Sequence, residues 1–238
     1  MGAKMKTEAE MLKELEGFDT PTITNVVATY PGDRENCLGL YHPWEGAWYT
    51  DELLKCIYPE LGPKAGFAVT CVMGLPDPAF NRLSMADLLR ALDASDKPTV
   101  VIIKQDLPKR IKKFSGLSGG NMTTAFKRLG PVGCISDGPS RDIDEIRPME
   151  FQYMLTGVCA GHGPYQVRAV NVPVEVCGMR VAPGDAVHMD SSGAVKFPRE
   201  RLQIVLELAG KLASAESEKQ AAMRAANGVE EVIRAFSG

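Results

Sequence analysis

The hydrophobic pattern of residues 65–136 alternates between strands and helices. Continuous apolar runs at 65–73 (AGFAVTCVM), 99–104 (TVVIIK) and 132–136 are rich in β-branched residues, which is typical of buried strands. Between these runs the sequence predicts helices at about 84–92 and 121–129. This order of strands and helices predicts an α/β layer in which the strands pair in parallel.

The pattern changes after Arg147-Pro148, where Gly and Pro turns separate short strands. We expect these strands to pair antiparallel. They are predicted at about 151–159, 165–176, 179–181, 185–189 and 194–197. Residues 199–236 are predicted to be helical and amphipathic, and they either pack on a neighbouring subunit or complete their own fold. Because no polar linker divides the chain, we expect a single domain.

The first 17 residues predict a charged amphipathic helix without the apolar core of a signal peptide or a membrane span. A second helix is expected over 23–30, with Pro21 in its first turn. The irregular segment 31–64 holds Trp44, Trp48 and His42. These rings either line a substrate or subunit interface or form a small satellite core, and we favour the interface or the core over catalysis.

Composition and charge exclude several classes of protein. The 238 residues are 45% hydrophobic and 24% charged, which is ordinary for a globular protein. A net charge of −3, from 27 basic and 30 acidic residues, leaves no electrostatic footprint for nucleic acid or an anionic membrane. The six cysteines form no C-x-x-C motif, and Cys71 and Cys134 lie in apolar runs as expected for buried thiols. We therefore expect a cytoplasmic protein.

The residues that carry chemistry concentrate between Ser118 and Arg147. Gly119 and Gly120 leave the amides of the following helix start unobstructed, and such a start attracts carboxylate or phosphate. The guanidinium of Arg141 matches a carboxylate with two hydrogen bonds, and Asp142 offers hard oxygens to a divalent cation. Together they predict a site for a 2-oxo acid beside a metal ion.

Each of these features also has an ordinary structural interpretation. Arg141-Asp142 can be a solvated surface pair, and Asp142 with Glu145 fits a helix-capping pattern. His162 lies between two glycines and can act as a general acid or base, but an exposed turn histidine is the favoured interpretation. His188 and Asp190 share a strand face and can bind metal, but a structural histidine is the default.

The run GGNMTTAFKRLGPVGCISDGPSRDIDEI resembles the signature of the RraA-like family. This family includes 4-hydroxy-4-methyl-2-oxoglutarate/4-carboxy-4-hydroxy-2-oxoadipate aldolases and the regulator of ribonuclease E activity. The resemblance extends over roughly residues 18 to 205. It implies an α/β fold of the swivelling β/β/α type, as a single domain with N- and C-terminal helices. The expected parts are an N-terminal helix at 1–17, an RraA-like domain at 18–205 and a C-terminal helical extension at 206–238.

The resemblance also implies roles for individual residues. Arg141 would bind the pyruvyl carboxylate and Asp142 would ligate Mg²⁺ or Mn²⁺. Backbone amides of the glycine loop and helix start would hold the substrate, at Gly119, Gly120, Asn121 and Met122. In one respect the chain departs from the aldolases, which carry an acidic residue 21 positions before the arginine, where this chain has Gly120.

The expected function is a metal-dependent lyase that acts on small anionic 2-oxo acids, by retro-aldol cleavage to pyruvate or by decarboxylation of oxaloacetate. Two alternatives remain open at this point. One is a non-catalytic regulatory binding protein, which the glycine at position 120 favours. The other is a hydrolase or isomerase that uses the same metal and carboxylate grip. The family implies a homotrimer or a dimer of trimers, in which a neighbouring subunit could supply the missing acid.

Overall fold

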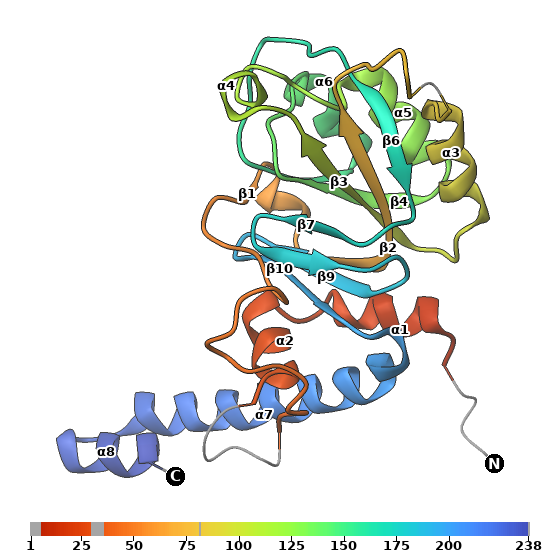
Figure 1. Cartoon of the computed structure of the whole chain (residues 1–238). Helices are drawn as coiled ribbons and strands as arrows, with labels where there is room; N and C mark the ends of the chain where they lie inside the picture. The colour runs from red at the N-terminus through yellow and green to blue at the C-terminus, as the bar shows by residue number, and fades with distance from the viewer. Residues whose placement is uncertain (1–5, 30–35, 81, 238) are drawn as a thin grey trace.

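The computed structural model describes residues 6–29, 36–80 and 82–237, and one mixed sheet organises this part of the chain (Figure 1). Its strands follow the order β1-β5-β4-β3-β2-β9-β10, and β6 also pairs with β2. Their bounds are β1 Lys55–Cys56, β2 Lys64–Gly74, β3 Thr99–Asp106, β4 Pro131–Ser136, β5 Gln152–Leu155, β6 Gln166–Val170, β9 Ala186–Asp190 and β10 Gly193–Phe197. A separate antiparallel hairpin consists of β7 (Val174–Val176) and β8 (Met179–Val181).

The helices of the described residues lie in two groups, one around the parallel strands and one beyond β9 and β10 (Figure 1). The first group comprises α3 (Met85–Ala94), α4 (Lys109–Lys112), α5 (Gly120–Arg128) and α6 (Ile143–Ile146). The second group comprises α1 (Glu8–Leu15), α2 (Thr20–Val27), α7 (Leu202–Ala225) and α8 (Val229–Ser237). Short 3-10 turns are η1 (Pro59–Leu61), η2 (Arg147–Met149) and η3 (Arg199–Arg201).

The parallel pairing predicted for residues 65–136 is confirmed. β2 pairs with β3 and β3 pairs with β4, both in parallel. Side chains of β3 alternate between two cores: Val101 and Ile103 pack in the core that includes α3 and α5, whereas Val100 and Ile102 pack in the core that includes β7 and β8. Both faces of β3 are therefore buried, which explains why its sequence is continuously apolar.

The prediction of antiparallel pairing for the β-rich half is only partly correct. β9 and β10 pair antiparallel, as β6 and β9 do with β2, but β5 pairs in parallel with β4. The turns α6 and η2 form a crossover between β4 and β5 that returns the chain in its original direction. The predicted strand 165–176 is also divided, because Asn171 has a φ of 52° that interrupts the extended backbone between β6 and β7.

The N-terminal helices are held by caps and by a shared apolar core. Thr7 and Asp19 cap α1 and α2 through bonds to Glu10 N and Thr22 N, so α2 begins three residues before the predicted position. Both helices pack against α7; α1 also packs against β2, and α2 packs against β9 and β10. Their shared core consists of Leu12, Leu15, Ile23, Val26, Val27, Ala186, Val195, Phe197, Leu202, Val205, Leu208 and Leu212, among others.

The predicted helix 199–236 is wrong in its continuity. α7 ends at Ala225, and Gly228 has a φ of 142°, a conformation that residues with a Cβ rarely adopt. α8 then turns back along the far end of α7, which projects beyond the rest of the chain (Figure 1). The expected domain boundary between residues 205 and 206 lies inside α7. None of the described helices is long and apolar enough to cross a membrane.

The aromatic residues of the segment 36–64 divide between core and surface. Trp48 is buried and stacks on Tyr41, with ring centroids 5.2 Å apart. Trp44 is 73% exposed, and its ring lies 4.7 Å from that of His42. Trp48 therefore packs into the core shared by α1, α2 and α7, not into a separate satellite core, whereas Trp44 lies on the surface. Residues 30–35, which contain the end of the predicted helix 23–30, lie outside the described residues.

Candidate active site

A small pocket of about 190 Å³ forms where the chain leaves the carboxyl ends of β3 and β4. The loop after β3 and α4 leads into the start of α5, and the turn after β4 leads to Arg141 and Asp142. This is the edge at which α/β sheets bind ligands. The pocket is lined by Gly116, Ser118, Gly119, Gly120, Asn121, Met122, Arg141, Asp142, His162 and Tyr165. All six residues predicted as the site therefore line one cavity.

Three loops are held side by side around this pocket by isolated backbone bridges. Leu117 bridges Ser140, Gly116 bridges His162, and Ser140 bridges Val158. These bridges join the loop before α5, the segment after β4 and the turn that contains His162. His162 therefore reaches the pocket through pairing between distant segments, which local sequence patterns do not encode.

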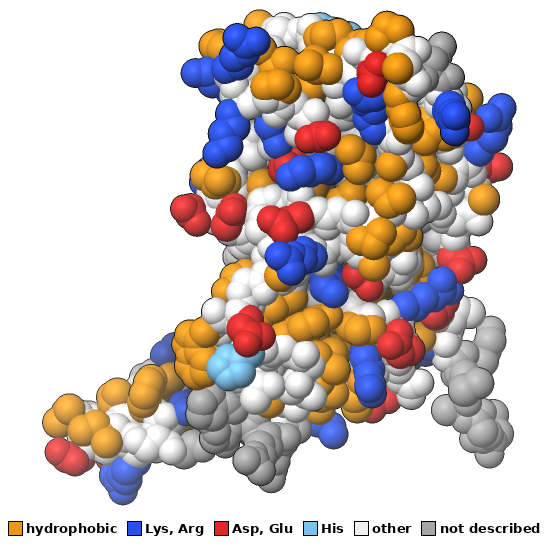
Figure 2. All heavy atoms as spheres, in the orientation of Figure 1, with side chains coloured by type: hydrophobic (Ala, Val, Ile, Leu, Met, Phe, Trp, Pro, Cys, Tyr) orange, Lys and Arg blue, Asp and Glu red, His pale blue; other side chains and the backbone are white. Residues whose placement is uncertain are grey.

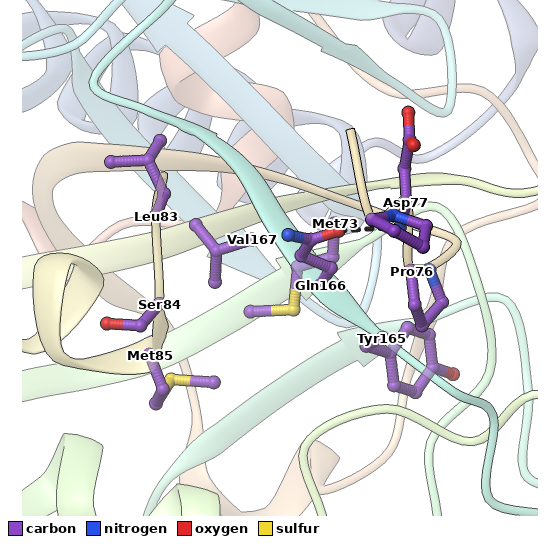
Figure 3. A pocket seen from close by; sticks show the side chains of 10 residues that line it. Met73, Pro76, Asp77, Leu83, Ser84, Met85, Tyr165, Gln166 and Val167 are labelled. Atoms are coloured by element: carbon purple, nitrogen blue, oxygen red, sulfur yellow. Dashed lines mark hydrogen bonds between the residues drawn. The ribbon is translucent and has the colours of Figure 1, made fainter. Parts of the chain in front are cut away.

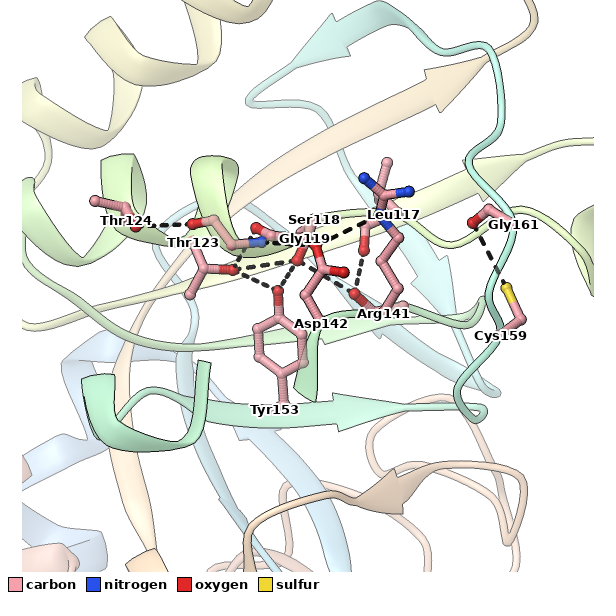
Figure 4. Close-up of polar contacts among 12 residues, drawn as sticks. Leu117, Ser118, Gly119, Thr123, Thr124, Arg141, Asp142, Tyr153, Cys159 and Gly161 are labelled. Atoms are coloured by element: carbon pink, nitrogen blue, oxygen red, sulfur yellow. Dashed lines mark hydrogen bonds and ion pairs between the residues drawn. The ribbon is translucent and has the colours of Figure 1, made fainter. Parts of the chain in front are cut away.

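Buried hydroxyl groups anchor the loop that precedes α5 (Figure 4). The hydroxyls of Tyr153 and Thr123 lie 2.6 Å apart and form a hydrogen bond with each other. The carbonyl oxygen of Ser118 lies within hydrogen-bond distance of both hydroxyls. The Ser140 hydroxyl donates to the same carbonyl at 3.2 Å. Burial raises the pKa of Tyr153, so this phenol stays protonated as a donor. The network holds Ser118 at a φ of 48° and fixes the start of α5.

The backbone of Asp142 directs its carboxylate toward the start of α5. Asp142 has left-handed φ and ψ angles of 59° and 33°. Its Oδ2 accepts a hydrogen bond from Gly120 N at 3.1 Å and lies 3.4 Å from Arg141 Nε. Asp142 does not cap α6 with its side chain, so the capping interpretation with Glu145 is wrong. Among the described residues, the contacts of this carboxylate end on Oδ2, and Oδ1 stays available to a ligand.

At the two glycines, carboxylate groups occupy the space where a side chain would begin. A Cβ at Gly119 would lie 2.2 Å from Asp142 Oδ2, and a Cβ at Gly120 would lie 2.1 Å from Glu145 Oε1. No such approach is possible for real atoms. Glu145 therefore holds its carboxylate over the position where aldolases of the resembled family carry their acidic side chain. An acid is absent from position 120 in the sequence, but one occupies that region in space.

Arg141, His162 and Tyr165 complete the wall of the pocket. The Arg141 side chain is about one-third exposed, at 34%, and lines the cavity. His162 is exposed, as predicted, but it also faces this cavity, with its ring centroid 6.2 Å from that of Tyr165. Tyr165 was not predicted as a site residue. Its hydroxyl donates to Ser115 O at 2.5 Å, and burial raises its pKa to about 12.

A sequence model of the RraA-like family, described as Aldolase/RraA, matches residues 49–196, more than half of the chain. The chain belongs to the RraA-like family. This RraA-like protein is 32% identical over 90 residues to an uncharacterized protein of Methanocaldococcus jannaschii, covering 37% of this chain and 43% of the relative. It is 29% identical over 127 residues to a protein of Halalkalibacterium halodurans provisionally named a 4-hydroxy-4-methyl-2-oxoglutarate aldolase, covering 52% and 58%. The chain thus spans about half the length of each of these two relatives.

Solved structures have the same fold as this RraA-like chain. An uncharacterized protein from Pseudomonas syringae superimposes with a TM-score of 0.71 at 19% identity, covering 98% of this chain and 99% of its own. RraAS2 of Streptomyces coelicolor, named as an unusual member of the RNase ES inhibitor RraA family, has a TM-score of 0.66 at 19% identity, covering 90% and 98%. The predicted fold class, the swivelling β/β/α domain with terminal helices, is confirmed.

The donor set of this RraA-like pocket fits a magnesium-type ion better than a zinc-type ion. The described residues contain no group of three or more His, Cys, Asp or Glu side chains with metal-binding geometry. The carboxylates of Asp142 and Glu145 lie over adjacent glycines at the mouth of α5. Mg²⁺ retains several waters and needs only one or two protein carboxylates, so an ion of this type does not require a third side chain.

The other histidine candidate lies away from the pocket and is structural. His188 is fully buried on β9, where its Nδ1 lies 2.9 Å from Thr20 Oγ1 and its Nε2 lies 3.1 Å from Leu15 O. Asp190 accepts a hydrogen bond from Thr20 N at 2.7 Å. Both ring nitrogens are engaged, so His188 ties α1 and α2 to the sheet and is not placed to bind a metal.

Proposed function

We propose that this RraA-like protein is a divalent-metal-dependent lyase that acts on small 2-oxo acids. The reactions are retro-aldol cleavage that releases pyruvate and decarboxylation of oxaloacetate. The observation that supports this proposal best is the convergence of three groups on one pocket. Arg141, Asp142 and the start of α5 line the cavity together, and the Asp142 carboxylate contacts both of the others.

Arg141 and the helix start would hold the carboxylate of the substrate. The guanidinium offers a planar pair of donors, and the backbone amides of Asn121 and Met122 belong to the first turn of α5, which has no intrahelical partners for them. The positive end of the helix dipole adds to this attraction. A carboxylate bound here would have its adjacent ketone near Asp142.

Asp142 would hold Mg²⁺ or Mn²⁺, with Glu145 as its second carboxylate neighbour. When bound, the ion supplies the positive charge that stabilises an enolate oxygen as the bond next to the ketone breaks. Both the retro-aldol reaction and the decarboxylation of oxaloacetate generate pyruvate enolate, so one site serves for both reactions.

Glu145 would handle the proton. Its carboxylate is exposed and covers Gly120, beside the pocket, where it can exchange protons with water and with substrate. In the retro-aldol direction it would accept the proton of the C4 hydroxyl, and in both reactions a proton returns to C3 of the enolate. Glu145 would therefore supply, from the same chain, the acidic group that is missing at position 120, so that no acid from a neighbouring subunit is needed.

The test is metal-dependent release of pyruvate from purified protein, with oxaloacetate and 4-hydroxy-4-methyl-2-oxoglutarate as substrates. Rates are compared with Mg²⁺, with Mn²⁺ and with a chelator, and metal without protein gives the spontaneous rate. Asp142→Asn should abolish the protein-dependent rate and Arg141→Lys should raise KM. Asp144→Asn is the matched control, because this residue is exposed two positions along the chain and does not line the pocket.

The proposal fails if no metal-dependent turnover appears above the spontaneous rate, or if Asp142→Asn and Asp144→Asn behave alike. Circular dichroism and thermal unfolding show whether each variant is folded. Inhibition of a ribonuclease by protein that lacks turnover would instead support the regulatory alternative.

We also propose that the chain self-associates as a homotrimer or a dimer of trimers in the cytoplasm. Hydrophobic side chains gather at the end of the arm formed by α7 and α8 (Figure 2). Val229, Val232, Ile233 and Phe236 of α8 are 39–68% exposed and lie at helical spacing. Residues 211–237 carry four basic and four acidic residues, so the arm has no net charge that would repel a second copy. Sedimentation of the full chain tests this, and a monomer contradicts it.

A further inference from the structure

A second and larger hollow adjoins the catalytic pocket. This groove has a volume of about 420 Å³, compared with about 190 Å³ for the pocket that contains Arg141 and Asp142. Tyr165 lines both, so the two cavities share a wall. The catalytic pocket has room for the 2-oxo acid group of a substrate. The groove is the adjacent space in which the rest of the substrate molecule would lie.

The groove has an apolar floor. The side chains of Met73, Met85 and Val167 converge on the same space, with Leu83 beside them (Figure 3). Met73 and Val167 are buried, and Leu83 and Met85 are half-buried. Methionine side chains adapt to the shape of a ligand, and their sulfur atoms make favourable contacts with aromatic rings. The composition of this surface therefore suits an aryl group.

The charge of the groove excludes a second carboxylate. Among the described residues that line it, none is a lysine or arginine, and its single charged residue is Asp77. Arg168, the chain neighbour of Val167, is already engaged: its Nη1 lies 3.4 Å from Asp77 Oδ2 and its Cζ lies 5.3 Å from the centre of the Phe80 ring. A diacid would place its distal carboxylate against apolar side chains without a partner, which is costly.

We infer that the substrate is a monocarboxylic 4-hydroxy-2-oxo acid with an aryl group on C4, and that this group lies in the groove lined by Met73, Leu83, Met85 and Val167. The inference rests on the proposed lyase function and names its substrate class. In the reaction the C3–C4 bond breaks, and its electron pair stays with C3 as pyruvate enolate. The C4 hydroxyl loses its proton and becomes the carbonyl of an aromatic aldehyde, while C3 gains a proton to give pyruvate.

The experiment compares three substrates in the presence of Mg²⁺: oxaloacetate, 4-hydroxy-4-methyl-2-oxoglutarate and 4-hydroxy-2-oxo-4-phenylbutanoate. We expect kcat/KM for the phenyl substrate to exceed that for the diacid by about tenfold or more, the discrimination that an apolar pocket provides. Met85→Lys should reverse this preference, because it places a cation in the groove. Leu83→Lys is a second variant with the same expected effect, and Leu53→Lys, at an exposed apolar residue outside the groove, should keep the wild-type ratio.

Three outcomes decide the inference. A wild-type preference for the diacid overturns it, and so does an unchanged phenyl-to-diacid ratio in both groove variants. If no substrate is turned over, the lyase proposal fails separately. Calorimetric measurement of the affinities for phenylpyruvate and pyruvate then tests whether the groove binds an aryl group. Tighter binding of phenylpyruvate by about tenfold, lost in Met85→Lys, supports the groove, and equal affinities overturn it.

Discussion

Replacement of Gly120 by alanine should separate the stability of α5 from the position of the Glu145 carboxylate. The new Cβ would lie 2.1 Å from Oε1, 2.4 Å from Cδ and 2.6 Å from Oε2 of Glu145. Carbon and oxygen atoms that are not bonded stay more than about 3 Å apart, so the carboxylate must move by about 1 Å or more. Because Glu145 is exposed and flexible, it moves in preference to the backbone.

The substitution should affect stability and catalytic activity in opposite directions. Alanine in place of glycine at the first residue of α5 should stabilise the helix by up to about 0.5–1 kcal/mol, since Gly120 has no positive φ that a side chain would oppose. A catalytic group displaced by about 1 Å costs about 100-fold in rate, which corresponds to about 2.7 kcal/mol in the barrier. We therefore expect an equal or higher melting temperature and a kcat lower by about two orders of magnitude.

The assay measures pyruvate release from oxaloacetate with Mg²⁺, alongside thermal unfolding of the same samples. Gly210→Ala is the matched control, because Gly210 is exposed inside α7 and a Cβ there meets nothing within 4 Å. This control should gain similar stability and keep full activity. Full activity of Gly120→Ala would refute the role of Glu145, and so would a Glu145→Gln variant with wild-type kcat. A large loss of stability in Gly120→Ala would show that the clash is not relieved by Glu145.

Three further predictions concern buried groups. Burial lowers the pKa of His188 below its usual 6.5, so below about pH 6.5 the unfolded chain binds a proton that the folded chain does not. The free energy of unfolding in urea should therefore fall as pH drops from 7 to 5, and an equal slope in His188→Gln would contradict this. Burial raises the pKa of Cys134 to about 12, so this thiol should resist iodoacetamide at pH 8 until urea unfolds the chain. The Asp137 side chain is only 8% exposed, and its Oδ2 lies 2.7 Å from Nζ of both Lys104 and Lys112. Asp137→Asn should lower the free energy of unfolding in urea by about 2–3 kcal/mol. A loss below about 0.5 kcal/mol would show that these ion pairs contribute no more than exposed ones.

Local sequence patterns determined the elements that carry the site. The apolar runs of β2, β3 and β4 predicted buried parallel strands, because side chains on both faces of these strands enter a core. The glycine pair at the start of α5 and the Arg141-Asp142 pair after β4 were recognised from residue type and spacing. The strand predictions were confirmed because an apolar run depends only on the properties of neighbouring residues.

Only the tertiary structure decided how these residues act together. The left-handed backbone of Asp142 directs its carboxylate to Gly120 N and not to the helix that follows it, and Glu145 covers the position where an acid is absent from the sequence. His162 reaches the pocket through a backbone bridge to Gly116, and Tyr165 is tied to the same distant loop by its hydroxyl, which donates to Ser115 O. The physical reason is that helix and strand periodicity is encoded locally, whereas pairing between loops depends on hydrogen bonds that form only after the sheet has placed them side by side.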